Sequence, residues 1–332
     1  MGTESPDAPD KRAASLHVFF NGDMVLEEEA LVSVRDRGFL YGDGVFETLR
    51  SYNGRPFLIE DHLQRLASSA QALGIPLRYG LEELRLAVEN LLRLNRLTDA
   101  LIRVTLSRGK SPHYGLQPPE SASGGQPTLI IQTHPFRPHP EESYKQGVRL
   151  AISTYRRSTT CPLARHKTAN FLAGIMARQE AARRWHSTQG VQDALFLNTE
   201  GQVCEATVSN IFMVESGRVV TPSLQANILP GITRKKVLEI CQGEGITAAE
   251  ELFGTERLLQ ANEVFLTNSL MEIMPVSCIE DKRVSKTIPG KITNRLMEAY
   301  KGLTTVDSRQ GKTVFSVCCM LSTGLYYQFL PS

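Results

Sequence analysis

The hydrophobic pattern of the chain alternates between short apolar runs and amphipathic stretches, which predicts a mixed α/β protein. In the first half, an apolar stripe every three or four residues predicts a helix from Asp61 to about Gly74 and a second helix over 81–94. Apolar runs bounded by turn residues predict strands over 16–21, 45–52, 55–59, 100–106 and 127–133. Asn53-Gly54, between two of these runs, is a strong signal for a hairpin turn.

The second half repeats this alternation. Strands are expected over 148–154, 194–198, 202–205, 210–214, 218–221 and 263–267, and helices over 168–184 and 232–242. A polar stretch with three prolines, residues 135–144, reads as a linker. We therefore expect a polar, disordered tail over 1–15, a small N-terminal domain over 16–136, a larger domain over 145–303, and a compositionally different tail over 304–332.

Composition narrows the class of protein. The chain has 332 residues, 41% of them hydrophobic, and a net charge of +2, which is ordinary for a soluble globular protein. Lys and Arg are spread along the chain, so no nucleic-acid partner is expected. No run reaches the ~18 apolar residues of a membrane helix. The six cysteines show no metal-binding spacing, and we expect reduced thiols in a cytoplasmic protein without a metal site.

Four motifs, in a fixed order, carry the candidate chemistry. A lysine alone is usually a solvated surface charge, but Lys167 precedes an apolar-rich stretch, and partial burial would favour the free amine that forms a Schiff base. Glu205 ends a predicted hairpin strand, where its carboxylate could pair with a protonated pyridine nitrogen. These two residue types suit a pyridoxal phosphate (PLP) cofactor.

The remaining motifs predict a seat for a phosphate group. Gly231-Ile232-Thr233 opens a predicted helix, where free backbone N–H groups favour an anion. Thr267 would add a hydroxyl, and Arg65 a guanidinium able to make two parallel hydrogen bonds. Each residue by itself has an ordinary structural explanation. All four motifs in this order and spacing are much less expected by chance than any one of them. Nucleotide-binding motifs and a serine-hydrolase elbow are absent or incomplete in the sequence.

The combined motifs resemble the class IV aminotransferases, the fold type IV PLP enzymes, over roughly residues 16–303. The likeness rests on segments 37–50, 62–66, 205–210, 231–234 and 267–276, together with Lys167. It implies a two-domain α/β fold whose larger domain has a β-barrel-like core, with the cofactor between the domains. It also implies a homodimer in which each pocket borrows residues from the neighbouring subunit.

The resemblance assigns roles by position. Lys167 would hold the cofactor and later move a proton, and Glu205 would contact the pyridine nitrogen. The phosphate would be held by Arg65, Ile232, Thr233 and Thr267. Three residues, Tyr41, Arg50 and Arg103, fall where members of the family often shape the substrate pocket. Phe171 departs from the frequent tyrosine, so the contact of that hydroxyl with the cofactor is lost.

The family contains several activities. Segments 46–48 and 207–210 depart from the usual branched-chain aminotransferase motifs, and segment 267–276 looks most like 4-amino-4-deoxychorismate lyases. The resemblance therefore favours a lyase that forms 4-aminobenzoate and pyruvate in folate biosynthesis. A branched-chain or D-amino-acid aminotransferase is the alternative, and a non-catalytic PLP-binding protein is the third reading.

Overall fold

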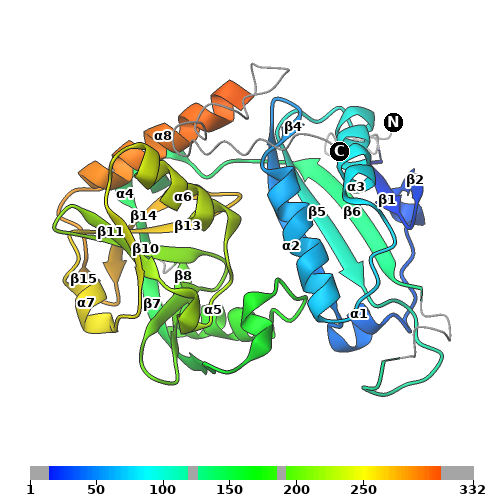
Figure 1. Ribbon diagram of the computed structural model, residues 1–332, viewed down its shortest axis with the longest axis horizontal. Coiled ribbons are helices and arrows are strands. Elements are labelled where there is room, and N and C mark those ends of the chain that lie inside the picture. Colours follow the sequence, from blue (N-terminus) through cyan, green and yellow to red (C-terminus); the bar gives the residue numbers. More distant parts are fainter. Residues whose placement is uncertain (1–14, 119–125, 185–191, 308–332) are drawn as a thin grey trace, which may run out of the picture.

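The protein contains two β-sheets with helices packed on each (Figure 1), as the computed structural model shows for residues 15–118, 126–184 and 192–307. The predicted α/β class is confirmed. The first sheet has the spatial order β2-β1-β6-β5-β3-β4, and all neighbouring strands in it are antiparallel. Its strands are β1 His17–Phe20, β2 Asp23–Leu26, β3 Gly44–Tyr52, β4 Arg55–Pro56, β5 Ala100–Ser107 and β6 Thr128–Pro135.

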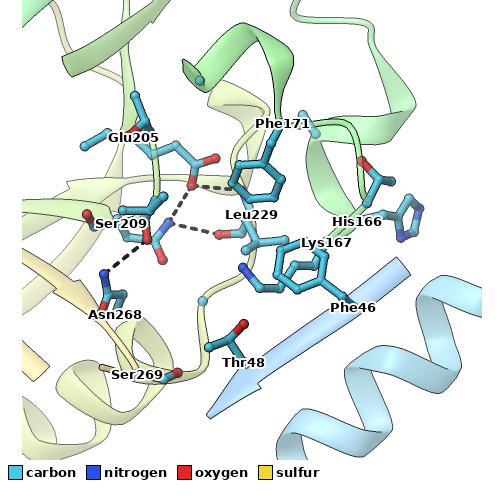
Figure 2. A pocket seen from close by; sticks show the side chains of 18 of the residues that line it. Phe46, Thr48, His166, Lys167, Phe171, Glu205, Ser209, Leu229, Asn268 and Ser269 are labelled. Atoms are coloured by element: carbon cyan, nitrogen blue, oxygen red, sulfur yellow. Dashed lines mark hydrogen bonds between the residues drawn. The ribbon is translucent and has the colours of Figure 1, made fainter. Parts of the chain in front are cut away.

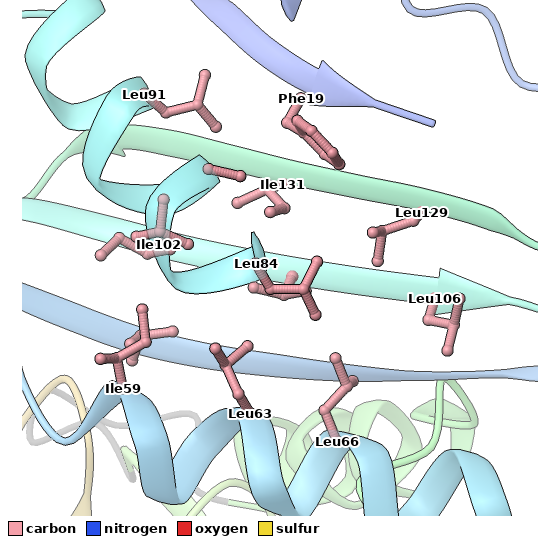
Figure 3. Close-up of a cluster of buried hydrophobic side chains, with 14 of the residues drawn as sticks. Phe19, Ile59, Leu63, Leu66, Leu84, Leu91, Ile102, Leu106, Leu129 and Ile131 are labelled. Atoms are coloured by element: carbon pink, nitrogen blue, oxygen red, sulfur yellow. The ribbon is translucent and has the colours of Figure 1, made fainter. Parts of the chain in front are cut away.

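Two helices, α2 (Ile59–Ala72) and α3 (Leu81–Leu94), cover one face of this sheet. Their apolar stripes pack on alternate residues of the strands (Figure 3), and Leu84, Leu91 and Ile102 are fully buried. Burial of each such side chain contributes about 1.5–3 kcal/mol. The helix predicted over 81–94 is confirmed at both ends.

The side chains of β3 alternate between two environments, as the period of a strand requires. Val45 and Leu49 join the core under α2 and α3, and Glu47, on the same face, contacts α2. Phe46 and Thr48 point the other way, toward the second sheet, and line a cavity there. One strand thus supplies both the core and the candidate site.

The second sheet is mixed and has the order β12-β11-β10-β13-β14-β7-β8-β9, with β15 paired to β14. Its strands are β7 Val148–Arg157, β8 Asp193–Asn198, β9 Val203–Ala206, β10 Asn210–Glu215, β11 Arg218–Pro222, β12 Ala248–Glu251, β13 Glu263–Asn268, β14 Glu272–Ile279 and β15 Lys282–Arg283. The sheet curls until its ends meet. Gln202, beside β9, bridges Gly254, and Val203 N–H donates to the Phe253 carbonyl just after β12. This closure produces the predicted barrel-like core.

Further helices surround this barrel: α4 Glu141–Gln146, α5 Leu172–Arg184, α6 Ile232–Gly243, α7 Thr255–Leu259 and α8 Lys291–Asp307. A short helix, α1 (Arg37–Tyr41), precedes β3 in the first part of the chain. In the described ranges, no helix is long and apolar enough to span a bilayer. The predicted tails over 1–15 and 304–332 lie almost entirely outside the described residues.

Several predicted boundaries are wrong. The strand expected over 55–59 ends at Pro56, and α2 begins at Ile59 rather than Asp61. The linker expected to reach residue 144 ends earlier, because α4 begins at Glu141.

The helix expected from residue 168 begins only at Leu172. Residues 167–169 are instead extended and pair with β3: Phe46 N–H donates to the Lys167 carbonyl, and Ala169 N–H to the Gly44 carbonyl, both at 2.9 Å. This pairing between distant segments overrides the local preference for helix.

Candidate active site

A cavity of about 900 Å³ lies between the two sheets. The first sheet and α2 contribute to its wall, and so do segment 157–174, the β9–β10 connection, the start of α6 and the loop after β13. Seven of the nine predicted site residues line it: Arg65, Arg103, Lys167, Glu205, Ile232, Thr233 and Thr267. Residues far apart in the sequence therefore form one site.

Lys167 reaches the cavity from the extended segment that pairs with β3. Its amine lies 4.5 Å from the centroid of the Phe46 ring and 5.8 Å from that of Phe171 (Figure 2). Burial lowers the pKa of Lys167 to about 8; the charges of Glu47 and Glu205 oppose this shift, and Arg65 acts with it. At pH 8 about half of the molecules carry a neutral amine, against about 0.4% for an ordinary lysine. The amine is thus suited to nucleophilic attack.

Glu205 lies on β9 with both carboxylate oxygens occupied. Arg157 donates to Oε1, while the Asn210 side chain (2.9 Å) and the Leu229 N–H (3.2 Å) donate to Oε2 (Figure 2). Burial raises the pKa of Glu205, and the Arg157 guanidinium opposes that effect. The contacts hold the carboxylate in one orientation at the cavity wall.

The start of α6 forms another part of the wall. Gly231 is the N-cap and Ile232 the first helical residue, as predicted. A Cβ atom at Gly231 would lie 1.9 Å from the Asn210 Oδ1 atom, so only glycine fits. The first N–H groups of a helix lack intrahelical acceptors, and those at Ile232 and Thr233 belong to this first turn. The helix start therefore presents free backbone N–H groups to the cavity at the place where the phosphate seat was predicted, and such groups favour an anion.

Thr267 and Arg65 line the same cavity as the start of α6. The Thr267 hydroxyl is buried and has no hydrogen-bond partner within the described chain. The Arg65 guanidinium donates twice to Glu47, at 2.7 Å each, and once to the Pro230 carbonyl at 2.9 Å, directly before the N-cap of α6. A buried hydroxyl without a partner suits a ligand that accepts hydrogen bonds, as a phosphate does.

Arg103, on β5, presents a cation to the cavity. Its guanidinium lies 3.9 Å from the Phe46 ring centroid, and its Nε donates to the Thr105 hydroxyl at 3.2 Å. Burial lowers the pKa of Arg103, and within the described ranges no carboxylate contributes to that shift. The group can accept a carboxylate from a ligand.

Two predicted substrate residues, Arg50 and Tyr41, do not line the cavity. Arg50 forms an ion pair with Glu272 at 3.0 Å and stacks on Tyr52. Arg50 therefore lies where β3 meets β14, rather than in the pocket. Tyr41 ends α1 and accepts a hydrogen bond from Gly115 N–H at 2.9 Å.

Other polar groups in the cavity wall, or directly behind it, were not predicted from the sequence. Arg157 follows a predicted strand, and no motif in the sequence marked it as a site residue. Glu47 and His62 were visible within the motifs, but they received no role. The spacing of His62 and Arg65, three residues apart on one helix, places both on the same face, and this could have indicated a shared partner.

Comparisons with known proteins agree with this geometry. The sequence model of the family described as "Amino-transferase class IV" matches residues 44–279. A putative branched-chain-amino-acid aminotransferase from Methanocaldococcus jannaschii is 36% identical, covering 87% of this chain and 97% of its own. A D-alanine aminotransferase from Bacillus licheniformis is 31% identical, covering 90% and 100% of the two chains.

Solved structures show the same architecture. The branched-chain amino acid aminotransferase of Escherichia coli superposes with a TM-score of 0.81 at 30% identity, covering 87% of this chain and 95% of the other. A putative 4-amino-4-deoxychorismate lyase from Legionella pneumophila gives a TM-score of 0.73 at 31% identity, with coverages of 82% and 95%. Another branched-chain enzyme of this group was solved with pyridoxamine 5′-phosphate.

The chain belongs to the class IV aminotransferase family. It is an enzyme of the PLP-dependent transaminases and lyases that make up this family, and its cofactor is pyridoxal phosphate. The residues present fit that cofactor. A lysine amine with a lowered pKa, a buried carboxylate, a helix start with glycine at its N-cap, and a buried hydroxyl without a partner in the described chain share one cavity.

Proposed function

We propose that the chain is a 4-amino-4-deoxychorismate lyase, which cleaves its substrate to 4-aminobenzoate and pyruvate. The observation that carries any PLP reaction here is the Lys167 amine, whose pKa of about 8 leaves about a tenth of the molecules with a neutral, reactive amine at pH 7. The lyase choice is supported by the departure of segments 46–48 and 207–210 from the usual branched-chain motifs, by the likeness of segment 267–276 to lyases, and by the similar Legionella structure. The cation of Arg103 suits a substrate that carries carboxylates.

The chemistry divides between cofactor and protein. Pyridoxal phosphate, when bound, supplies an aldehyde that joins the substrate amine and a ring that withdraws electrons from the adjoining carbon. Lys167 removes the proton from that carbon. Glu205 keeps a proton on the pyridine nitrogen, and Arg157 and Asn210 hold its carboxylate in place.

Later steps also use the protein's own groups. In the lyase reaction, the bond between a carbon of the substrate's own ring and the pyruvyl ether oxygen breaks, and its electron pair leaves with the oxygen. That oxygen needs a proton, which the Lys167 ammonium can return. Arg103 would bind a substrate carboxylate, and Ile232, Thr233, Thr267 and Arg65 would hold the phosphate.

Transamination is the second candidate, because the names of the M. jannaschii and B. licheniformis relatives favour it. In that reaction Lys167 would return the proton to the cofactor instead. Arg103 could bind a carboxylate in either reaction, so it does not discriminate. A purely binding role is the weakest reading, since Lys167 and Glu205 both line the cavity.

A paired assay separates the two reactions. Purified protein is given aminodeoxychorismate in one arm, and L- and D-amino acids with 2-oxoglutarate in the other. We expect fluorescent 4-aminobenzoate in the first arm and none with the Lys167→Ala variant. Amino-group transfer without 4-aminobenzoate would replace the lyase by a transaminase. A colourless protein that does not bind added PLP would contradict both.

We also propose that the chain forms a homodimer. Apolar side chains next to α1 are strongly exposed: Leu31 79%, Val34 73%, Phe39 73%, Tyr114 74% and Leu116 79%. Arg37 ties the loop that carries the last two to α1, since it donates to the carbonyls of Gly115 and Leu116. Several strongly exposed apolar side chains near one helix favour an interface with a second subunit.

Tyr41 lies within this surface, so it would reach the neighbouring subunit's pocket rather than its own. Light scattering should give twice the chain mass for the wild type, and the Phe39→Glu variant should shift toward the monomer. A wild-type monomer with full activity would exclude the dimer.

The described cysteines, Cys161, Cys204, Cys241 and Cys278, form no disulfide, which supports a cytoplasmic location.

A further inference from the structure

Three side chains form a hydrogen-bonded chain from the interior to the cavity. Glu47 Oε2 lies 2.7 Å from His62 Nδ1, and His62 Nε2 lies 3.2 Å from the Ser269 hydroxyl. Glu47 and His62 are buried, with 0% and 1% exposure, while Ser269 lines the cavity. Ser269 lines the same cavity as the start of α6, and at the other end of the network Glu47 holds Arg65, a residue of the proposed phosphate seat.

The direction of each hydrogen bond follows from the charges. Burial raises the pKa of Glu47, but Arg65 and His62 outweigh this and lower it to about 2. An ionised carboxylate only accepts, so His62 Nδ1 carries a proton and donates it. Burial lowers the pKa of His62, and the charges of Arg65 and Lys167 lower it further. Glu47 raises it, but the net shift is downward. His62 is therefore neutral, its Nε2 is bare, and the Ser269 hydroxyl donates to it.

This arrangement conflicts with a bound dianion. The Ser269 proton points at His62, so only the oxygen lone pairs remain for the cavity. A phosphate dianion also presents only acceptors, and two acceptors repel. If the Ser269 hydroxyl turned to the phosphate instead, His62 Nε2 would be buried without a partner, which costs about 1–3 kcal/mol.

We propose that binding of a phosphate dianion at the start of α6 is coupled to the uptake of one proton by His62. The protonated ring then donates from Nε2 to Ser269, and Ser269 donates to the phosphate. The charged groups facing His62 are Glu47 from β3, Arg65 from α2, and Lys167 from the segment paired with β3. A dianion beside the two cations removes their repulsion of an imidazolium. This inference rests on the proposed phosphate seat.

The direct test is nitrogen NMR of the His62 ring. The full-length Lys167→Ala protein is used, since it lacks the other amine that titrates in the cavity and can be freed of cofactor by dialysis. The probe is phenyl phosphate, which has no aldehyde, amine or pyridine nitrogen and is a dianion above about pH 7. We expect Nε2 to be bare without the probe and protonated with it. A bare Nε2 in the phosphate-bound protein would overturn the proposal.

The affinity supplies a second readout. Uptake of one proton requires the Kd of phenyl phosphate to rise about tenfold per pH unit at pH values between the pKa of His62 in the free protein and its higher pKa in the complex, and to level off above the latter. His62→Gln, in the Lys167→Ala background, should remove this slope. His166→Gln should keep it, because that histidine also lines the cavity but contacts Ser69 instead.

The outcomes separate the two proposals. A slope that persists in His62→Gln would show that another group takes up the proton. That result would refute the role of His62 and leave the phosphate seat standing. If neither phenyl phosphate nor PLP binds the protein, the phosphate seat itself is refuted, and the proton coupling with it.

Discussion

Thr267 offers the sharpest test of the cofactor site, because its hydroxyl is buried without a partner. Thr267→Val keeps the shape of the side chain and removes that hydroxyl. The backbone of residue 267 pairs with Asn210 and Ile273 on either side, so the strand should not change. The variant therefore isolates one oxygen atom.

The magnitude follows from the cost of an unsatisfied group. A buried polar atom without a hydrogen bond costs about 1–3 kcal/mol, so the cofactor-free Thr267→Val protein should be about 1–2 kcal/mol more stable than the wild type. A hydrogen bond to a charged phosphate contributes about 1.5–3 kcal/mol, so the variant should bind PLP about 10- to 150-fold more weakly. Stability and binding are thus expected to move in opposite directions.

Urea unfolding of the cofactor-free proteins measures the first effect, and equilibrium dialysis of PLP measures the second. The matched control is Thr221→Val. Thr221 is also fully buried, but its hydroxyl donates to the Ile211 carbonyl at 2.8 Å. That variant should lose about 1 kcal/mol of stability and keep its affinity for PLP. If Thr267→Val is destabilised as the control is, or binds PLP normally, the hydroxyl is not reserved for the cofactor.

Three further predictions concern the catalytic groups. The rate at which the cofactor-free protein captures PLP should rise with pH around a midpoint near pH 8 and level off about one unit higher, because only the neutral Lys167 amine reacts. Stopped-flow absorbance measures this rate, and a midpoint near pH 10 would contradict the lowered pKa. Lys167→Ala should abolish turnover, whereas Glu205→Gln should retain the cofactor and slow turnover by orders of magnitude; a wild-type rate in the second variant would remove the role of that carboxylate. Arg103→Leu should raise KM much more than it lowers kcat if the guanidinium binds a substrate carboxylate, and steady-state kinetics with an unchanged KM would refute this.

Regular local patterns were the most predictable part of the fold. The helix over 81–94 and the hairpin around Asn53-Gly54 depend on an apolar stripe and on turn residues, which act within a few positions. The start of α5 was predicted wrongly, because residues 167–169 pair with β3, more than a hundred positions away. A pattern read within a short window does not contain that partner.

The site shows the same division. Lys167, Glu205 and the Gly231–Thr233 helix start could be placed from residue type and order, and all of them line the cavity. Arg50 could not be placed in this way. The alternation along β3 shows which residues face each side of the strand, but it does not show that Glu272, from a distant segment, pairs with Arg50. Arg157 was missed because its partner, Glu205, is specified only by the folded sheet.

The order of residues alone therefore determined the α/β class, the hairpins and the set of groups available for PLP chemistry, because these depend on neighbours in sequence. Tertiary structure decided which groups meet, which cations are already paired, and how far the pKa of Lys167 falls. The physical reason is the range over which each kind of interaction acts along the sequence. Hydrogen bonds within turns and helices span a few residues, whereas burial and charge act through space between segments such as Arg65 and Pro230, which are 165 positions apart.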